Sequence, residues 1–150
     1  LFRSLLIIFL MFKKFGWKKG LFLVLFVSLL VAFSDQFTNV IRGIFERLRP
    51  NNDTSINHLL RTLITPQSYS FTSGHATTSM TFSVFVYLLL KDSYKYIKFI
   101  FIFPLFFAYS RLYLGVHFPI DILTGATIGT ILGCYAFKLE EFLARKIVAT

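Results

Sequence analysis

The segment Leu21–Ile41 reads LFLVLFVSLLVAFSDQFTNVI, and its length and composition decide the fold class. A helix rises about 1.5 Å per residue, so roughly 20 apolar residues cross the hydrocarbon core of a bilayer. The segment shows no alternation of apolar and polar residues over strand lengths, which favours a helix over a barrel strand. The sequence therefore predicts a transmembrane helix over these residues.

Other apolar stretches follow the same pattern on both sides of this helix. Three lie after it, at Ala76–Leu90, Tyr96–Leu114 and Pro119–Phe137. The run Leu1–Phe12 is about half the length of a spanning helix, so we expect that the natural N-terminus and part of a first helix are missing. The pattern predicts an all-α, polytopic transmembrane bundle with about five visible spans. Pro104, inside one of them, is expected to kink its helix.

The composition excludes most soluble classes. Hydrophobic residues make up 55% of the 150 residues, 20 of them Phe, and the mean hydropathy is +0.67. A soluble domain of this size could not bury so many large apolar side chains. The net charge of +9 would suggest nucleic acid in a soluble protein, but these basic residues cluster between apolar runs, as in membrane topology. A single cysteine, Cys134, excludes an internal disulfide and a cysteine-built zinc site.

The basic residues predict the orientation. In an alternating five-span chain, all nine lysines fall on one side: Lys13, Lys14, Lys18, Lys19, Lys91, Lys95, Lys98, Lys138 and Lys146. By the positive-inside rule that side is cytoplasmic. The outward connections carry arginines instead: Arg42, Arg47, Arg49, Arg61 and Arg111. A guanidinium binds phosphate oxygens through two hydrogen bonds, which is a reason to place arginine against the trend.

Two further features bear on packing. Gly125, Gly129 and Gly133 recur every four residues along the last span, a strip that allows helices to approach closely. We expect it to pack inside the bundle rather than in a homodimer contact. The outward loop Pro50–Ser73 is the only long polar segment of the sequence.

The first polar group is RGIFERLRP, from Arg42 to Pro50. Arg42 and Arg49 are seven residues apart, so on a continuous helix they share one face with Glu46. The group is then either part of an anion site or a solvated helix end with an internal ion pair.

The second polar group, Ser73-Gly74-His75, opens the span that begins near Ala76. Free backbone N–H groups at a helix start, with a serine hydroxyl, can bind an anion, and Gly74 lets a ligand approach the backbone. The alternative is that Thr72 or Ser73 only caps the helix and that His75 is an interfacial residue.

The third polar group lies in SRLYLGVHFPID, from Ser110 to Asp121. Gly115 ends one span and Pro119 can begin the next helix. The four-residue gap from His117 to Asp121 permits the carboxylate to bond one imidazole nitrogen, which leaves the other free as a nucleophile. Arg111 can reach the same pocket. The alternative is an interfacial histidine and a helix-capping aspartate.

Together, the three groups predict one site for an oxyanion, most simply phosphate. Two histidines, one carboxylate and three arginines reach the same outer rim from three separate segments. The carboxylates are too few for a two-metal phosphatase, and two histidines with one aspartate suggest zinc only weakly. We therefore expect no metal and no cofactor.

These motifs resemble the type-2 phosphatidic-acid phosphatase family, an integral-membrane group that shares its site with vanadium haloperoxidases. The family pattern corresponds here to Arg42-x6-Arg49-Pro50, Thr72-Ser73-Gly74-His75 and Ser110-Arg111-x5-His117-x3-Asp121. Only the third motif matches fully, since Arg42 replaces a lysine and Thr72 replaces a proline. Family members usually have six spans, so the resemblance implies one more helix than the five predicted here.

The resemblance also implies a mechanism. His117 attacks phosphorus and forms a phosphohistidine, Asp121 orients His117, and His75 acts as general acid and then as base. Five groups are implied to bind the phosphoryl oxygens: Arg42, Arg49, Ser73, Gly74 and Arg111. Asp121 is expected to raise the pKa of His117, which works against the neutral nucleophile, and the sequence leaves this balance open.

We expect residues 1–150 to form one membrane-embedded phosphatase domain that hydrolyses a lipid phosphate or diphosphate. Candidate substrates are undecaprenyl diphosphate, phosphatidic acid, phosphatidylglycerol phosphate and lipid A phosphates. The expected location is a bacterial cytoplasmic membrane with the site facing outward. The expected partners are the lipid substrate and the bilayer, with no nucleic acid and no obligate protein partner. The alternatives are a phosphotransferase and a non-catalytic lipid-phosphate-binding membrane protein.

Overall fold

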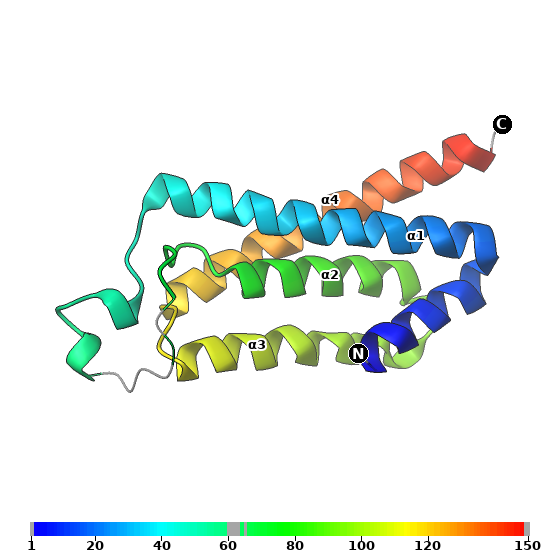
Figure 1. The fold of residues 1–150 in the computed structure, drawn as a ribbon. Coiled ribbons are helices and arrows are strands. Elements are labelled where there is room, and N and C mark those ends of the chain that lie inside the picture. The colour runs from blue at the N-terminus through cyan, green and yellow to red at the C-terminus, as the bar shows by residue number, and fades with distance from the viewer. Residues whose placement is uncertain (1, 60–63, 65, 149–150) are drawn as a thin grey trace.

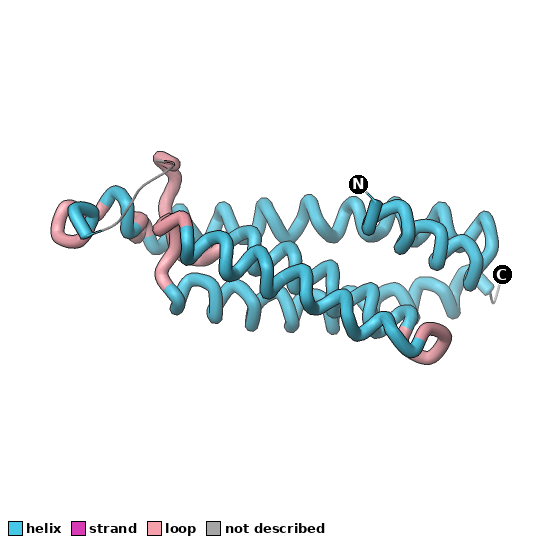
Figure 2. Tube along the Cα trace, turned by 90° about the horizontal axis from the view of Figure 1, so that it is seen from below, coloured by secondary structure: helices cyan, strands magenta, loops and turns pink. Residues whose placement is uncertain are grey.

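The computed structural model describes residues 2–59, 64 and 66–148, and all regular secondary structure in these residues is helical. The α-helices are α1 (Phe2–Phe45), α2 (Gly74–Leu90), α3 (Ile102–Tyr113) and α4 (Pro119–Val148), and the short 3-10 helices are η1 (Pro50–Asn52), η2 (Asn57–Leu59) and η3 (Lys95–Phe101). The helices run side by side along one long axis (Figure 1), and the described connections lie at the two ends of the bundle (Figure 2). The predicted all-helical membrane bundle is confirmed.

Helix α1 is bent at one residue. Gly16 has φ 75° and ψ 178°, which are not helical values, and the residues before it form an arm set at an angle to the rest of α1 (Figure 1). Glycine adopts a positive φ without steric cost. The arm packs beside the connection after α2, where the Tyr94 hydroxyl donates to the carbonyl of Leu10 at 3.4 Å. The predicted break between Phe12 and Leu21 is therefore a kink in one helix.

Helix α2 is the central element, because it contacts α1, α3 and α4. Its contact with α4 runs along the predicted glycine strip. A Cβ placed on Gly125 would lie 2.7 Å from the carbonyl oxygen of Ser73, and one on Gly133 would lie 2.8 Å from that of Thr81. The expected packing of this strip inside the bundle is confirmed.

The glycine strip leads to a stability prediction. Gly129→Ala should destabilise the protein by about 1–3 kcal/mol, because the new methyl overpacks the interface against the Thr77 carbonyl and the Met80 side chain. The matched control is Gly43→Ala on α1, where a Cβ meets nothing within 4 Å. That change should be neutral or stabilising by up to about 1 kcal/mol, since alanine favours the helix. Thermal unfolding in detergent micelles measures both, and equal stability of the two variants would contradict tight α2–α4 packing.

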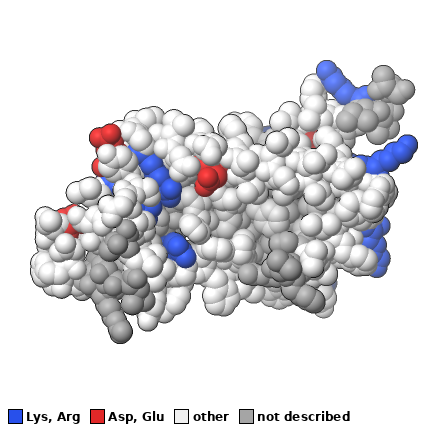
Figure 3. Space-filling model, in the orientation of Figure 1, with Lys and Arg blue, Asp and Glu red and all other residues white. Residues whose placement is uncertain are grey.

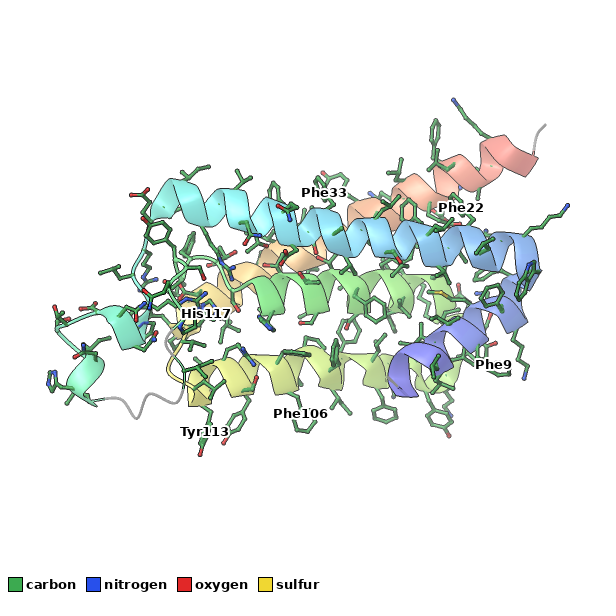
Figure 4. The ribbon with its side chains drawn as sticks, in the orientation of Figure 1. Phe9, Phe22, Phe33, Phe106, Tyr113 and His117 are labelled. Atoms are coloured by element: carbon green, nitrogen blue, oxygen red, sulfur yellow. The ribbon has the colours of Figure 1, made fainter. Side chains whose placement is uncertain are left out.

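The surface of the bundle suits a bilayer. Large apolar side chains such as Phe33 and Phe106, the latter 67% exposed, point outward (Figure 4). In Figure 3 the middle of the visible face is mostly uncharged, and Lys and Arg lie toward the two ends. By length and composition, three stretches of the described chain hold helices long and apolar enough to cross a membrane: Leu5–Asn52, Lys95–Tyr113 and Pro119–Lys146. Helix α2 is apolar but shorter, at 17 residues.

The lysine-rich connections meet at one end of the bundle. The Lys14 ammonium donates to the carbonyl of Leu89 at 2.8 Å, and Lys19 pairs with Glu140 at 3.3 Å. The kink of α1, the end of α2 and the later half of α4 therefore lie together at this end, while His117 lies at the other (Figure 4). The predicted separation of these lysines from the polar motifs is confirmed.

Two helix boundaries differ from the prediction. The span expected over Tyr96–Leu114 begins as the 3-10 helix η3 and continues as α3, and Pro104 is the third residue of α3. A proline in the first helical turn costs no hydrogen bond, so the kink expected there is absent. Helix α4 begins at Pro119 as predicted and extends beyond Phe137 to Val148.

Candidate active site

The segment after α1 corrects the first motif. Helix α1 ends at Phe45, Glu46 has φ 45°, and Arg49 is extended, with φ −74° and ψ 152°. A proline pushes the residue before it out of the helical region, so Pro50 holds Arg49 extended. The prediction that Arg42, Glu46 and Arg49 share one face of a continuous helix is therefore wrong. Both arginines nevertheless reach the same site, one from the helix and one from the extended segment.

Arg49 is buried, with 5% of its surface exposed, and its hydrogen-bond partners are neutral. Its Nε donates to the Ser68 carbonyl at 2.6 Å and its Nη2 to the Ser68 hydroxyl at 2.9 Å. Its Nη1 lies 3.0 Å from the Val116 carbonyl and 3.1 Å from Nε2 of His117. A buried cation bonded to neutral groups keeps most of its charge available to an anion.

His117 is 4% exposed and lies between Arg49 and Asp121. A guanidinium has only donors, so the contact with Arg49 requires Nε2 to accept and places the imidazole proton on Nδ1. Nδ1 faces Oδ2 of Asp121 at 3.6 Å, which is longer than a hydrogen bond. The carboxylate thus faces the predicted side of the ring without the predicted hydrogen bond.

The protonation balance of His117 favours the neutral ring. Burial lowers the pKa of His117 below its usual value, the Asp121 carboxylate acts in the opposite direction, and the charges of Arg49 and Arg42 lower it further. Desolvation penalises a buried imidazolium, and here it outweighs the raising effect of Asp121. The lone pair on Nε2 is therefore available near neutral pH.

Asp121 is fully buried and is held at three points. Its Oδ1 accepts from Nη1 of Arg47 at 3.0 Å, and its Oδ2 accepts from the backbone N–H of Phe118 at 2.9 Å. Its backbone carbonyl accepts from the N–H of Ser73 at 3.0 Å, which joins the third motif to the second.

Sequence reasoning named Arg47 as an outward arginine but missed its contact with the site. In an extended chain, residues two apart point to the same side. Arg47 and Arg49 are two apart and Pro50 follows them, so an extended reading of this segment would have placed both guanidiniums on the same side.

The start of α2 forms the next wall of the site. Ser73 is the N-cap residue, but its side chain makes no cap hydrogen bond, and the buried hydroxyls of Thr72 and Ser73 have no protein partner. Arg42 donates from Nε to the Thr72 carbonyl at 2.9 Å, and a Cβ on Gly74 would lie 3.0 Å from its Nη2. The side-chain cap considered as an alternative is therefore absent, and two hydroxyls remain free beside a guanidinium.

His75 and Arg111 complete the group. The His75 ring is tilted against the Phe107 ring of α3, with centroids 5.4 Å apart, and the His75 side chain is exposed. Arg111 donates from Nε to the Ser110 hydroxyl at 3.3 Å. The charges that act on His75 are those of Arg111, His117, Arg42 and Arg49. The structure therefore brings all eight predicted site residues to one end of the bundle, whereas Arg61 lies outside the described residues.

The positive charge of this site comes from guanidinium groups. Among the described residues, no three of His, Cys, Asp or Glu are grouped so as to hold a metal ion. Arginines around an unprotonated imidazole nitrogen suit an oxyanion that is attacked by nitrogen.

The fold and site together define a helical membrane protein that gathers arginine, histidine and a helix start at one end. The chain belongs to the PAP2 superfamily, whose family model matches residues 20–145. The resemblance stated from the three motifs is thereby confirmed.

The chain is also similar in sequence to named phosphatases and in structure to a solved member of this family. The chain is 33% identical over 147 residues to a lipid A 4'-phosphatase of Bacteroides thetaiotaomicron, covering 95% of this chain and 63% of the relative. It is 31% identical to an undecaprenyl-diphosphatase of Sulfolobus acidocaldarius, covering 92% and 61%. The crystal structure of a transmembrane PAP2 type phosphatidylglycerolphosphate phosphatase from Bacillus subtilis superposes with a TM-score of 0.69 at 25% identity, covering 93% of this chain and 69% of that one. The chain thus spans about three fifths of the length of the two curated relatives.

Proposed function

We propose that the protein removes phosphate from a lipid phosphate or diphosphate through a phosphohistidine on His117. The observation that carries this proposal is the 3.1 Å contact between Nη1 of Arg49 and Nε2 of His117. It places a guanidinium next to the unprotonated ring nitrogen. A bound phosphoryl group would take over the Arg49 hydrogen bond and leave the Nε2 lone pair open for attack. A phosphoryl group held by Arg49 would present its phosphorus to that nitrogen.

The first step transfers the phosphoryl group to the protein. The Nε2 lone pair of His117 forms a bond to phosphorus, and the bond from phosphorus to the lipid oxygen breaks. The leaving oxygen takes the electron pair and a proton from His75, which acts as general acid. The lipid departs as an alcohol or, from a diphosphate, as a monophosphate.

The second step releases phosphate. His75, now neutral, takes a proton from water, and the hydroxide attacks the phosphorus of the phosphohistidine. The bond from phosphorus to nitrogen breaks and its electron pair returns to Nε2 of His117. His75 is again protonated, so the cycle closes with the hydrolysis of one phosphate bond.

The remaining groups stabilise the charge that spreads over the phosphoryl oxygens in both steps. We assign this role to Arg42, Arg49 and Arg111, with the Ser73 hydroxyl and the backbone N–H of Gly74. Fixed donors in a water-poor site are worth more than donors in water, because they need no reorganisation. The buried Ser73 hydroxyl without a protein partner supports its part in this cradle.

The leaving group is a lipid because the cradle lies at the end of helices that face hydrocarbon along their length. The headgroup enters the arginine site while the tail stays in the bilayer. The opposite end carries the lysine-rich connections, and by the positive-inside rule this distribution supports a site on the outer face. The names of the relatives, which include a lipid A 4'-phosphatase and an undecaprenyl-diphosphatase, support an envelope lipid as substrate.

One assay tests the proposed reaction class. Phosphate release by the full-length protein in lipid micelles should change by less than about 2-fold in excess chelator, because the guanidiniums supply the charge that a metal would otherwise supply. Vanadate, which mimics the five-coordinate transition state, should inhibit competitively. Four lipid substrates are compared in this assay: undecaprenyl diphosphate, phosphatidic acid, phosphatidylglycerol phosphate and lipid A 4'-phosphate. Loss of turnover in chelator would overturn the scheme.

A further inference from the structure

We propose that Arg47 is a positioning residue, which holds Asp121 in the place from which this carboxylate orients His117. The inference deepens the proposed function and rests on it. It also assigns a role to Arg47, which occupies one of the six unspecified positions of the first motif.

Arg47 reaches Asp121 from the extended segment after α1. Its Nη1 lies 3.0 Å from Oδ1 of Asp121, whose side chain is fully buried. A buried carboxylate is costly unless it is paired and hydrogen-bonded. The Phe118 N–H satisfies only Oδ2, so Arg47 provides the charged partner of the other oxygen.

A second contact fixes the guanidinium itself. The Arg47 guanidinium carbon lies 4.1 Å from the centroid of the Phe118 ring, a cation–π arrangement that a planar guanidinium favours. The Arg47 carbonyl also accepts from the N–H of Ser70 at 2.8 Å. Arg47 is therefore held from both its backbone and its side chain, as a support for another group must be.

The consequence for His117 is electrostatic as well as geometric. Charged or titratable groups reach this end of the bundle from every element around His117: Arg42 of α1, Arg47 and Arg49 of the following segment, His75 of α2, Arg111 of α3 and Asp121 of α4. Asp121 is the only carboxylate among them. The Asp121 carboxylate raises the pKa of His117, and the Arg47 cation bound to its Oδ1 should reduce that effect.

The test replaces Arg47 with glutamine, which can still donate to Oδ1 but carries no charge. The pKa of His117 should rise by about half a unit to one unit, because the field of Asp121 is no longer offset. NMR titration of histidine-labelled protein in micelles measures this directly. The acid limb of the pH profile of kcat should move to higher pH together with the pKa of His117. The value of kcat should fall roughly 10-fold to 100-fold, as it does when other groups that support a functional histidine are removed. KM should stay within about 3-fold, because Arg47 does not touch the substrate.

Two variants separate this role from a general loss of structure. Arg47→Lys keeps the charge and should retain the wild-type pKa of His117 and most of kcat. Arg145→Gln makes the same charge change at the opposite end of the bundle and should alter neither quantity. An unchanged pKa in Arg47→Gln, or a higher KM at constant kcat, would overturn the proposal. If the wild type releases no phosphate from any substrate, the proposed function fails, while the titration still decides the role of Arg47.

Discussion

Replacing His117 with alanine is expected to abolish phosphate release, lowering kcat by about 10⁴-fold or more. The change removes Nε2, the nitrogen that Arg49 contacts at 3.1 Å, and no other described side chain holds a lone pair at that position. Initial rates of phosphate release measure the loss. A phosphohistidine is labile in acid and stable in base. The covalent species is therefore sought after an alkaline quench, with ³²P-labelled substrate. It should appear in the wild type and be missing in the variant.

The matched control for His117 is His58→Ala. His58 is an exposed histidine in the middle of η2, in the loop between α1 and α2, and its loss should leave kcat and KM within about 2-fold. Because His117 is buried, His117→Asn serves as a second variant that keeps a polar side chain in the cavity. Thermal unfolding of all three variants checks that the fold survives. Turnover within about 10-fold of wild type in either His117 variant would exclude this residue as the nucleophile.

Arg49→Ala should produce the second largest effect, a loss of about 10²–10³-fold in kcat/KM. Arg49 combines a contact to the proposed nucleophile with a buried charge whose direct partners are neutral. Its removal takes away transition-state stabilisation and also part of the binding of the phosphate. The inhibition constant of vanadate should therefore weaken by a similar factor, since this anion resembles the transition state.

Arg49→Lys distinguishes charge from geometry at the same position. Lysine keeps the charge but cannot span the Ser68 carbonyl, the Ser68 hydroxyl and the Val116 carbonyl as the guanidinium does. We expect it to recover no more than about one tenth of the lost kcat/KM. Arg145→Lys, at the other end of the bundle, is the control and should behave as wild type. A fully active Arg49→Lys would show that only a positive charge is needed there.

The helical bundle could be predicted from the sequence because a bilayer leaves few choices. Backbone groups in lipid must bond within their own segment, so an apolar run such as Leu21–Ile41 has to be helical. The boundaries between α3 and α4 were equally local: Gly115, with φ 62°, follows α3, and Pro119 begins α4. The glycine strip of α4 was readable for the same reason, since small residues at every fourth position can lie only on one face of a helix.

The route of the chain between α1 and the site could not be predicted from helical periodicity. The seven-residue spacing from Arg42 to Arg49 suits two helical turns, but Pro50 and the positive φ of Glu46 end the helix between them. The extended segment that results brings Arg47 to Asp121. This pairing joins residues 74 positions apart, and no local rule predicts such a contact.

The sequence by itself determined which residues lie in lipid, which end of the bundle carries the lysines, and that three polar motifs stand at the opposite end. These properties depend on the length, composition and spacing of single segments. The tertiary structure alone decided the distances within the site: Nε2 of His117 beside Arg49, Asp121 at 3.6 Å from Nδ1, and Arg47 behind Asp121. It decided them because the tight packing of α2 on α4, at glycines where a side chain would collide, sets how far Ser73 lies from Asp121.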